Sequence, residues 1–148
     1  MGSVFVGIDP GLKGYMATLY SDGQYALLPL PCQGSLLDAR AWQGQAFLIP
    51  AGAHILVEQQ FAKGRGGKTV LTNYGALLSH LRVAGHVPDT VSATKWKKHY
   101  GLSKDKVQSL EKVRELRPDI YDDDMTHDAA EAVLIALYAQ ELYERRTT

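Results

Sequence analysis

The pattern of apolar and polar positions along the chain predicts strands at the start and helices towards the end. Short apolar or small-residue runs bounded by turn residues predict five strands: Val4–Ile8, Gly14–Tyr20, Gln24–Leu30, Ile55–Gln59 and His86–Val91. The first three follow one another closely, with Ser21-Asp22-Gly23 as a turn between the second and third. They therefore form an antiparallel meander.

Apolar residues that recur every three or four positions predict the helices. These cover Ser35–Phe47, Thr69–Ala84, Ser92–Tyr100 and Lys104–Leu116, and a last helix begins at Asp128. Strands followed by helices over 148 residues indicate an α/β fold, and we expect residues 1–148 to form a single domain.

No apolar run approaches the roughly 18 residues of a membrane span, and the N-terminus lacks a signal-peptide pattern. The one cysteine, Cys32, excludes an internal disulfide and is typical of a reducing compartment. We therefore expect a cytoplasmic protein with no membrane partner.

Charge is unevenly distributed along the chain although the net charge is zero. Residues 63–106 carry nine Lys or Arg against two Asp, a net charge of +7, so the flanking segments together carry −7. This segregation favours a basic surface for a polyanion beside an acidic site for cations, although solvated helix faces produce such a pattern too.

Acidic residues stand where two predicted strands end and where the last helix begins. Asp9 follows the first strand directly and precedes Pro10-Gly11, a position where an Asp also caps turns. Glu58 ends a second apolar run, and Asp128 and Glu131 are three residues apart on one helix face. The neighbouring run Asp122–Asp124 is interpreted as acids favoured by the helix dipole.

If the two acid-tipped strands are neighbours and the last helix crosses them, Asp9, Glu58, Asp128 and Glu131 converge. Like charges about 4 Å apart repel by roughly 4 kcal/mol at an effective dielectric of 20, so such a cluster holds protons or binds cations. Oxygen-only ligands select Mg²⁺ or Mn²⁺. Two such ions would activate water against a phosphodiester.

The segment Phe61–Lys68 is rich in glycine and basic residues, which predicts a mobile loop over a site. It is not a nucleotide-binding P-loop, because Ala62 stands where the pattern before Gly67-Lys68-Thr69 requires a glycine.

Three motifs in order resemble the RuvC-type Holliday junction resolvases of the ribonuclease H-like superfamily. They are Gly-Ile-Asp-Pro-Gly-x-x-Gly around Asp9, Val-Glu-Gln-x-Phe from Val57, and Asp-Ala-Ala-Glu-Ala-x-x-Ile-Ala from Asp128. The short chain and the His-Asp-x-x-Glu ending are similar to the phage and prophage branch, which implies a bacterial or phage-infected host cell.

This resemblance implies a mixed five-stranded sheet of strand order 3-2-1-4-5 with helices on both faces, a homodimer, and metal-dependent paired nicking of four-way DNA junctions. The family's catalytic and metal-binding acids fall on Asp9, Glu58, Asp128 and Glu131, with Mg²⁺ or Mn²⁺, two per site. Bacterial relatives commonly have Asp at the last position, so Glu131 is a departure. His127 remains open as a metal ligand, a base or a residue of the first helical turn.

The resemblance also implies DNA contacts. Phe61 matches the family's aromatic wedge, which stacks on bases at the crossover, although a Phe at this place could also fold into the core. Lys97 and Lys106 match its essential lysines, and Trp96 is interpreted as a packing residue. Further basic residues are predicted to contact DNA: Lys63, Arg65, Lys68 and Lys98.

The helix over residues 69–84 is the candidate dimer interface, because Gly75 and Ala76 allow close approach. Three other functions stay open at this point. They are a ribonuclease H-like nuclease with broader branched-DNA or RNA–DNA hybrid specificity, a module that binds junctions without cutting them, and a relative of the actin-like ATPases.

Overall fold

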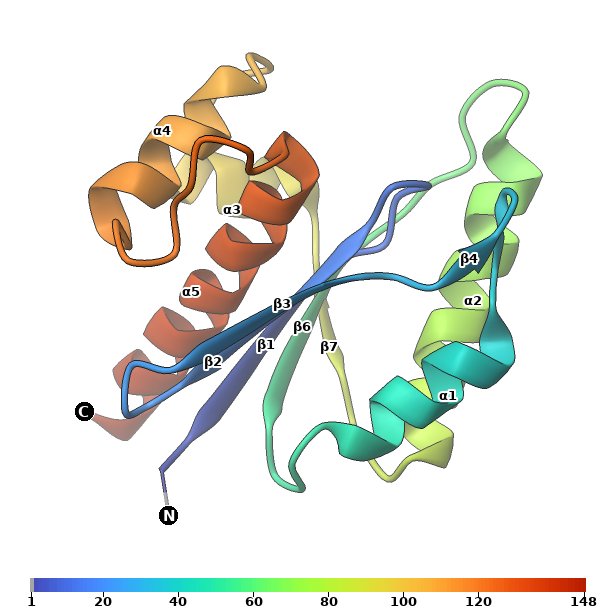
Figure 1. Ribbon diagram of the computed structural model, residues 1–148, viewed down its shortest axis with the longest axis horizontal. Helices are drawn as coiled ribbons and strands as arrows, with labels where there is room; N and C mark the ends of the chain where they lie inside the picture. The colour runs from blue at the N-terminus through green and yellow to red at the C-terminus, as the bar shows by residue number, and fades with distance from the viewer. Residues whose placement is uncertain (1) are drawn as a thin grey trace.

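A computed structural model describes residues 2–148, which form a β-sheet covered by helices on both faces (Figure 1). The sheet contains β1 (Val4–Asp9), β2 (Tyr15–Tyr20), β3 (Tyr25–Pro29), β6 (His54–Glu58) and β7 (Asp89–Val91). The helices are α1 (Ala39–Leu48), α2 (Gly67–Val83), α3 (Ala93–His99), α4 (Val107–Leu116) and α5 (His127–Thr147). Two short strands, β4 (Cys32–Gln33) and β5 (Leu36–Leu37), pair separately.

The sheet is mixed, with the strand order β3-β2-β1-β6-β7. The pairs β1–β2 and β2–β3 are antiparallel, whereas β1–β6 and β6–β7 are parallel. The predicted α/β class, the antiparallel meander and the order 3-2-1-4-5 are therefore confirmed, with β6 and β7 as the fourth and fifth strands of the sheet.

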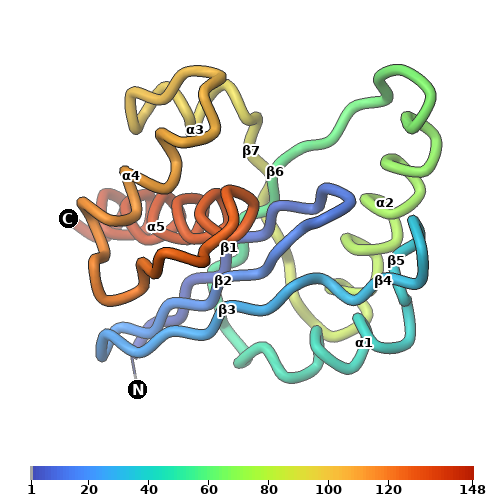
Figure 2. The backbone as a smooth tube through the Cα atoms, turned by 45° about the horizontal axis from the view of Figure 1, so that its top comes forward, coloured from blue at the N-terminus to red at the C-terminus, as the bar shows by residue number. Residues whose placement is uncertain are grey.

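Helices lie on both faces of the sheet (Figure 2), and each face has its own hydrophobic core. On one face, α5 packs with the buried residues Trp96 of α3 and Val113 of α4. On the other, Trp42 of α1 packs with Leu77 and Leu81 of α2. Because strand residues alternate between the faces, each core receives every second side chain of β1.

Helix α5 lies directly against β1 at Gly7. A Cβ atom on Gly7 would lie 2.2 Å from the backbone nitrogen of Ala136 and 2.4 Å from the carbonyl oxygen of Ala132. Any side chain at this position would push the helix away, because no real Cβ contact is so short. The glycine therefore sets the distance between α5 and the central strand.

The helix predicted over Ser35–Phe47 begins later than expected, at Ala39. Its first turn is capped by Asp38, whose side chain accepts a hydrogen bond from the backbone N–H of Ala41. The preceding Leu36–Leu37 pairs as a strand with Cys32–Gln33. This part of the prediction is wrong because two apolar residues of a short hairpin continue the helical pattern by chance.

The fifth strand, predicted over His86–Val91, is confined to Asp89–Val91. His86 is buried and turns away from the sheet, with its Nε2 atom 3.0 Å from the carbonyl oxygen of Ala46 in α1. This contact ties residue 86 to α1, and Pro88, which has no backbone N–H to donate to the sheet, directly precedes the strand. The ends of the other predicted elements agree with the structure or differ by at most three residues.

Within residues 2–148, no helix has the length and apolar character that crossing a membrane requires.

Candidate active site

The acidic site lies at the edge of the sheet where β1 and β6 end. These strands are parallel neighbours with Ile8 opposite Val57, so Asp9 and Glu58 are the next residue on each strand. Ile8 and Val57 belong to the core under α1 and α2. Since side chains alternate along strands, Asp9 and Glu58 project to the opposite face, which α5 covers.

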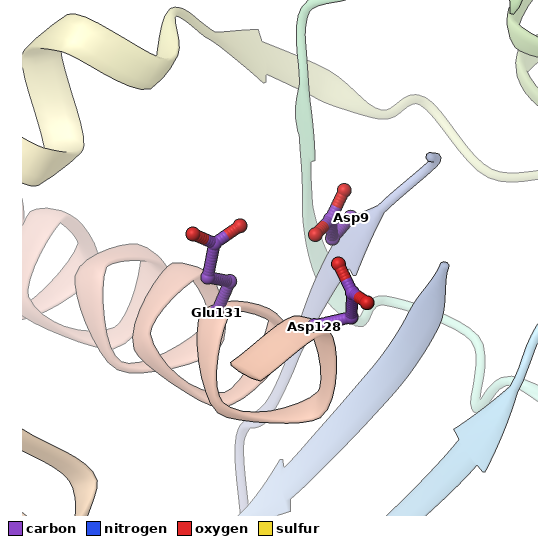
Figure 3. A group of neighbouring side chains, drawn as sticks. All are labelled: Asp9, Asp128 and Glu131. Atoms are coloured by element: carbon purple, nitrogen blue, oxygen red, sulfur yellow. The ribbon is translucent and has the colours of Figure 1, made fainter. Parts of the chain in front are cut away.

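The start of α5 brings two further carboxylates to this edge. Thr126 caps the helix by accepting a hydrogen bond from the Ala129 N–H at 3.2 Å, so Asp128 lies in the first turn and Glu131 one turn further. Asp9, Asp128 and Glu131 each offer one oxygen atom, and these atoms all lie within 4.8 Å of one another (Figure 3). The structure thus brings three of the four predicted acids together.

Asp9 is the most buried of these acids, with 5% of its surface exposed. Its Oδ1 atom accepts a hydrogen bond from the Gly11 N–H at 3.2 Å. Burial raises the pKa of Asp9 well above its usual value, and the nearby charges of Glu58 and Glu131 raise it further. An acid in this environment is stabilised either by a proton or by a cation.

Glu58 lies beside this cluster, but its carboxylate is held by other residues. The Trp96 Nε1–H donates to its Oε2 atom at 2.7 Å, and Gln60 Nε2 donates to its Oε1 atom at 3.3 Å. Burial raises the pKa of Glu58, although the Trp96 hydrogen bond opposes this shift. Glu58 is therefore close enough to raise the pKa of Asp9, while its orientation is fixed by Trp96.

A polar cleft of about 330 Å³ opens above the acids. Basic residues of α3 and the loop before α4 line it, namely Lys97, Lys104 and Lys106. Lys97 Nζ lies 3.2 Å from Glu131 Oε1. Lys104 and Lys106 add positive charge to the same cleft, which suits the binding of a phosphate there.

His127 also lines this cleft, and its Nε2 atom is 3.4 Å from Asp128 Oδ1. It is the first residue of α5. The histidine therefore lies next to the acid cluster, where its nearest carboxylate is that of Asp128.

The remaining residues predicted to contact DNA lie outside the cleft. Phe61 is 62% exposed, so the alternative that it folds into the core is wrong. It belongs to the β6–α2 loop with the exposed residues Lys63 and Arg65, and the loop projects from the sheet at the same end as α3 and α4 (Figure 2). Lys68 is exposed in the first turn of α2, and Lys98 is exposed on α3.

Sequence reasoning missed three residues near the acids. Trp96 is fully buried, as expected of a packing residue, but it also donates to Glu58. Gln60 is the second donor to Glu58, and Lys104 is a third lysine of the cleft. The sequence contains a signal for Lys104, which precedes Lys106 by two residues in one loop, and for Gln60, which follows Glu58 by two. The Trp96–Glu58 contact has no local signal.

The three clustered residues offer only carboxylate oxygens, which suit hard divalent cations such as Mg²⁺ and Mn²⁺. The raised pKa of Asp9 agrees with this fit, because a bound cation would compensate for the mutual repulsion of the acids. Together with the lysines of the cleft, the arrangement can bind a phosphodiester and a metal ion side by side.

No protein-family model matches the chain, and no curated protein matches its sequence. Solved structures do resemble it. Thermus thermophilus RuvC in complex with a Holliday junction substrate is 20% identical, with 99% of this chain and 97% of that chain covered and a TM-score of 0.71. Another Thermus thermophilus RuvC structure is 19% identical, with 98% and 97% covered and a TM-score of 0.66. Over almost its whole length, this chain has the fold of the RuvC Holliday junction resolvases.

Proposed function

We propose that this protein is a divalent-metal-dependent endodeoxyribonuclease that resolves four-way (Holliday) DNA junctions by paired symmetric nicks. The observation that carries the proposal is the convergence of Asp9, Asp128 and Glu131 within 4.8 Å, at one edge of a RuvC-like fold. Residues 1–148 would act as one nuclease domain in the cytoplasm. Membership of the phage and prophage branch remains a prediction.

Asp9, Asp128 and Glu131 would hold Mg²⁺ or Mn²⁺, and Glu58 would complete the ligand set for two ions, with His127 as a further ligand or base. When bound, such a pair of ions supplies an activated water and stabilises the leaving oxygen of the phosphodiester. Gly11 keeps one oxygen of Asp9 in place, and Trp96 does the same for Glu58. These contacts orient the carboxylates before the substrate arrives.

The lysines of the cleft would bind the DNA backbone next to the reacting phosphate. Lys97 and Lys106 reach the cleft from two different segments, so they can contact phosphates on both sides of the cut. Phe61 would stack on a base at the open centre of the junction, because an exposed aromatic ring on a loop is suited to that contact. Lys63, Arg65, Lys68 and Lys98 would position the arms of the junction through their phosphates.

Two copies of the chain would make the two cuts, and α2 is the proposed dimer interface. Among the exposed residues of α2, Thr72, Gly75 and Ser79 are small and three or four positions apart, and a Cβ atom on Gly75 would meet no other atom. A Gly75→Arg protein therefore folds normally but has a long charged side chain in the interface. We expect sedimentation to give a dimer for the wild-type protein and a monomer for Gly75→Arg. A wild-type monomer on junction DNA would contradict the dimer.

The proposal is tested with a synthetic mobile four-way junction, incubated with the protein in Mg²⁺, in Mn²⁺ and in EDTA. We expect symmetric nicks in either metal and none in EDTA. Flap DNA, linear duplex and an RNA–DNA hybrid serve as competing substrates. Faster cleavage of flaps or hybrids would favour a broader nuclease, and binding without any cut would favour a junction-binding module. Thermal stabilisation by ATP would instead favour the ATPase alternative.

A further inference from the structure

A second pocket, of about 290 Å³, lies next to the acid cluster at the start of α5. Leu12 and Tyr15 line it from the β1–β2 turn and the start of β2, and Leu30 and Cys32 line it from the segment after β3. Asp128 completes the wall at the start of α5. The pocket is thus built mainly from apolar side chains and a thiol.

Asp128 lines both this pocket and the polar cleft. The apolar pocket therefore adjoins the candidate reaction centre at Asp128. A phosphodiester held at the acids and the cleft lysines has a nucleoside on each side of the phosphorus atom. One of these two nucleosides then lies next to the apolar pocket.

The mouth of the pocket has the chemistry of a nucleotide site. Leu12 lines the pocket together with Asp128 and is 54% exposed. Its side chain can neither bind a metal ion nor form a hydrogen bond with the acids, so its exposure has no role in the acid cluster itself. The adjacent Lys13 is exposed and also lines the pocket. An apolar wall suits the flat face of a base, and a lysine at the rim suits a neighbouring phosphate.

We propose that this pocket binds a nucleobase that flanks the scissile phosphodiester, so that Leu12, Tyr15 and Leu30 help to determine which nucleotide is placed for cutting. The inference rests on the proposed nuclease function and adds a base-binding site to it. Such a base must leave its stack to enter the pocket. The open centre of a junction provides unstacked bases at lower cost than a continuous duplex does.

The single cysteine lines the pocket, so a thiol reagent can block the pocket at one known position. Cys32 is the only cysteine of the chain and is exposed, so N-ethylmaleimide modifies this position alone. Nicking rates are measured for modified and unmodified protein on an intact junction and on junctions with one abasic nucleotide beside the cut. The abasic nucleotide is moved through the flanking positions, one junction at a time.

We expect the reagent to lower the nicking rate on the intact junction about tenfold, which is the size of one lost stacking contact. One abasic position should lower the rate of the unmodified protein by a similar factor. At that position the rate loss from the reagent and the rate loss from the abasic nucleotide should not multiply. The modified pocket no longer binds the base, so removal of that base should change the rate little further. Cys32→Ser protein, which the reagent cannot modify, should show the same rate with and without treatment.

Leu12→Ala provides an independent wall variant, and Leu36→Ala is its matched control. Both leucines are 54% exposed, but Leu36 lies in β5 and does not line the pocket. Leu12→Ala should lose rate on the intact junction but little more on the abasic junction, whereas Leu36→Ala should behave as wild type on both. Non-multiplying losses in either the modified protein or Leu12→Ala support the base site. Fully multiplying losses, or no loss, in both overturn it.

Failure of the nuclease proposal can be told apart from failure of this one. If the wild-type protein nicks no junction, the same comparison is made on equilibrium binding of intact and abasic junctions in EDTA. Coupling between the pocket and one abasic position would then support the base site without the nuclease. An affinity that depends on neither change, or on both independently, would overturn it.

Discussion

The acid cluster and the β6–α2 loop are the two regions proposed to meet the junction, and they are built in opposite ways. The acids Asp9, Glu58 and Glu131 are at most 9% exposed, and backbone, indole and amide donors hold the first two. The loop, in contrast, extends through exposed residues, with Phe61 62% exposed and Gly64 at a φ of +63°.

This difference separates the two tasks of the proposed nuclease, bond cleavage and recognition of a branched substrate. Bond cleavage needs carboxylates whose positions are fixed before the substrate binds, which a packed core provides. Recognition of a branched molecule needs an aromatic side chain and charges that can adapt to it, which a surface loop provides. Substitutions in the two regions should therefore fail in different ways.

The largest effect is expected for Asp9→Asn. The substitution keeps the acceptor for Gly11 but removes a charged ligand at the centre of the cluster, and a loss of several kcal/mol of transition-state stabilisation lowers the rate by about a thousandfold or more. Nicking is measured on the four-way junction in Mg²⁺, and binding on the same junction in EDTA. Binding should remain within a factor of about two. Loss of binding together with nicking would mean that Asp9 serves the fold and not the chemistry.

Trp96→Phe should have the next largest effect, because it removes the donor to Glu58 while keeping an aromatic ring in the core. Residues that orient a metal ligand change metal affinity or activity by about 10- to 100-fold. We expect this loss in the nicking rate, with partial recovery at high Mg²⁺.

The matched control is Trp42→Phe. Trp42 is equally buried, and its indole N–H donates to the Leu77 carbonyl oxygen at 3.1 Å in the other core. Both variants should lose on the order of 1–3 kcal/mol of unfolding free energy, measured by urea unfolding. Only Trp96→Phe should lose activity, and equal losses of activity would mean that the Trp96 effect is general destabilisation.

A smaller effect is expected for Phe61→Ala. Loss of one base-stacking side chain should weaken junction binding about tenfold, measured by fluorescence anisotropy, and leave binding to linear duplex almost unchanged. Phe47→Ala is the control, because Phe47 is 61% exposed but lies in α1. Neither variant should change the melting temperature by more than about 2 °C, since both rings are mostly solvated. Equal junction affinities for the two variants would contradict the wedge.

The smallest effect concerns stability and pH. Because the pKa of Asp9 is raised in the folded state, the folded chain binds more protons than the unfolded chain above the ordinary aspartate value of 3.8. The free energy of unfolding therefore falls as the pH rises through the window between the two pKa values. In EDTA at about pH 7.5, Asp9→Asn should melt about 2–4 °C above wild type, as expected for about 1 kcal/mol, and the difference should vanish at about pH 3.

Asp119→Asn is the control of opposite sign. Its hydrogen bond and ion pair with Arg117, at 2.8 Å, lower the pKa of Asp119. Stability from this group is present at neutral pH and is lost as the pH falls through the lowered pKa. Asp119→Asn should therefore not raise the melting temperature at neutral pH. If Asp9→Asn melts below wild type in EDTA at neutral pH, the proposal that the acids destabilise the fold by mutual repulsion is wrong.

Much of this arrangement could be predicted from the sequence because its signals are local. Asp9 ends an apolar run and precedes Pro10-Gly11, and Asp128 and Glu131 have helical spacing before an apolar stripe. These patterns, with the resemblance to RuvC, predicted the sheet order and the elements that carry the acids. The cap at Asp38 was also readable, since Asp is a preferred N-cap residue, but the apolar pair before it favoured a longer helix.

The features that could not be predicted depend on contacts between distant residues. His86 contacts the carbonyl oxygen of Ala46, 40 positions away, and Glu58 is oriented by Trp96, 38 positions away. Neither pair has a spacing that a periodic pattern can detect. For the same reason, the sequence predicted that Glu58 lies near Asp9, Asp128 and Glu131 but did not predict that Trp96 donates the hydrogen bond that orients its carboxylate.

The direct contact of Gly7 with α5 also makes the candidate reaction centre sensitive to a change two residues before Asp9. A single added methyl group at this position would separate strand and helix, and the helical carboxylates would move with the helix while Asp9 stays on the strand. Residue 7 should therefore tolerate no replacement in a saturation screen for activity, although it carries no functional group. Redesign of this scaffold for a new substrate should keep that glycine and vary the loops instead.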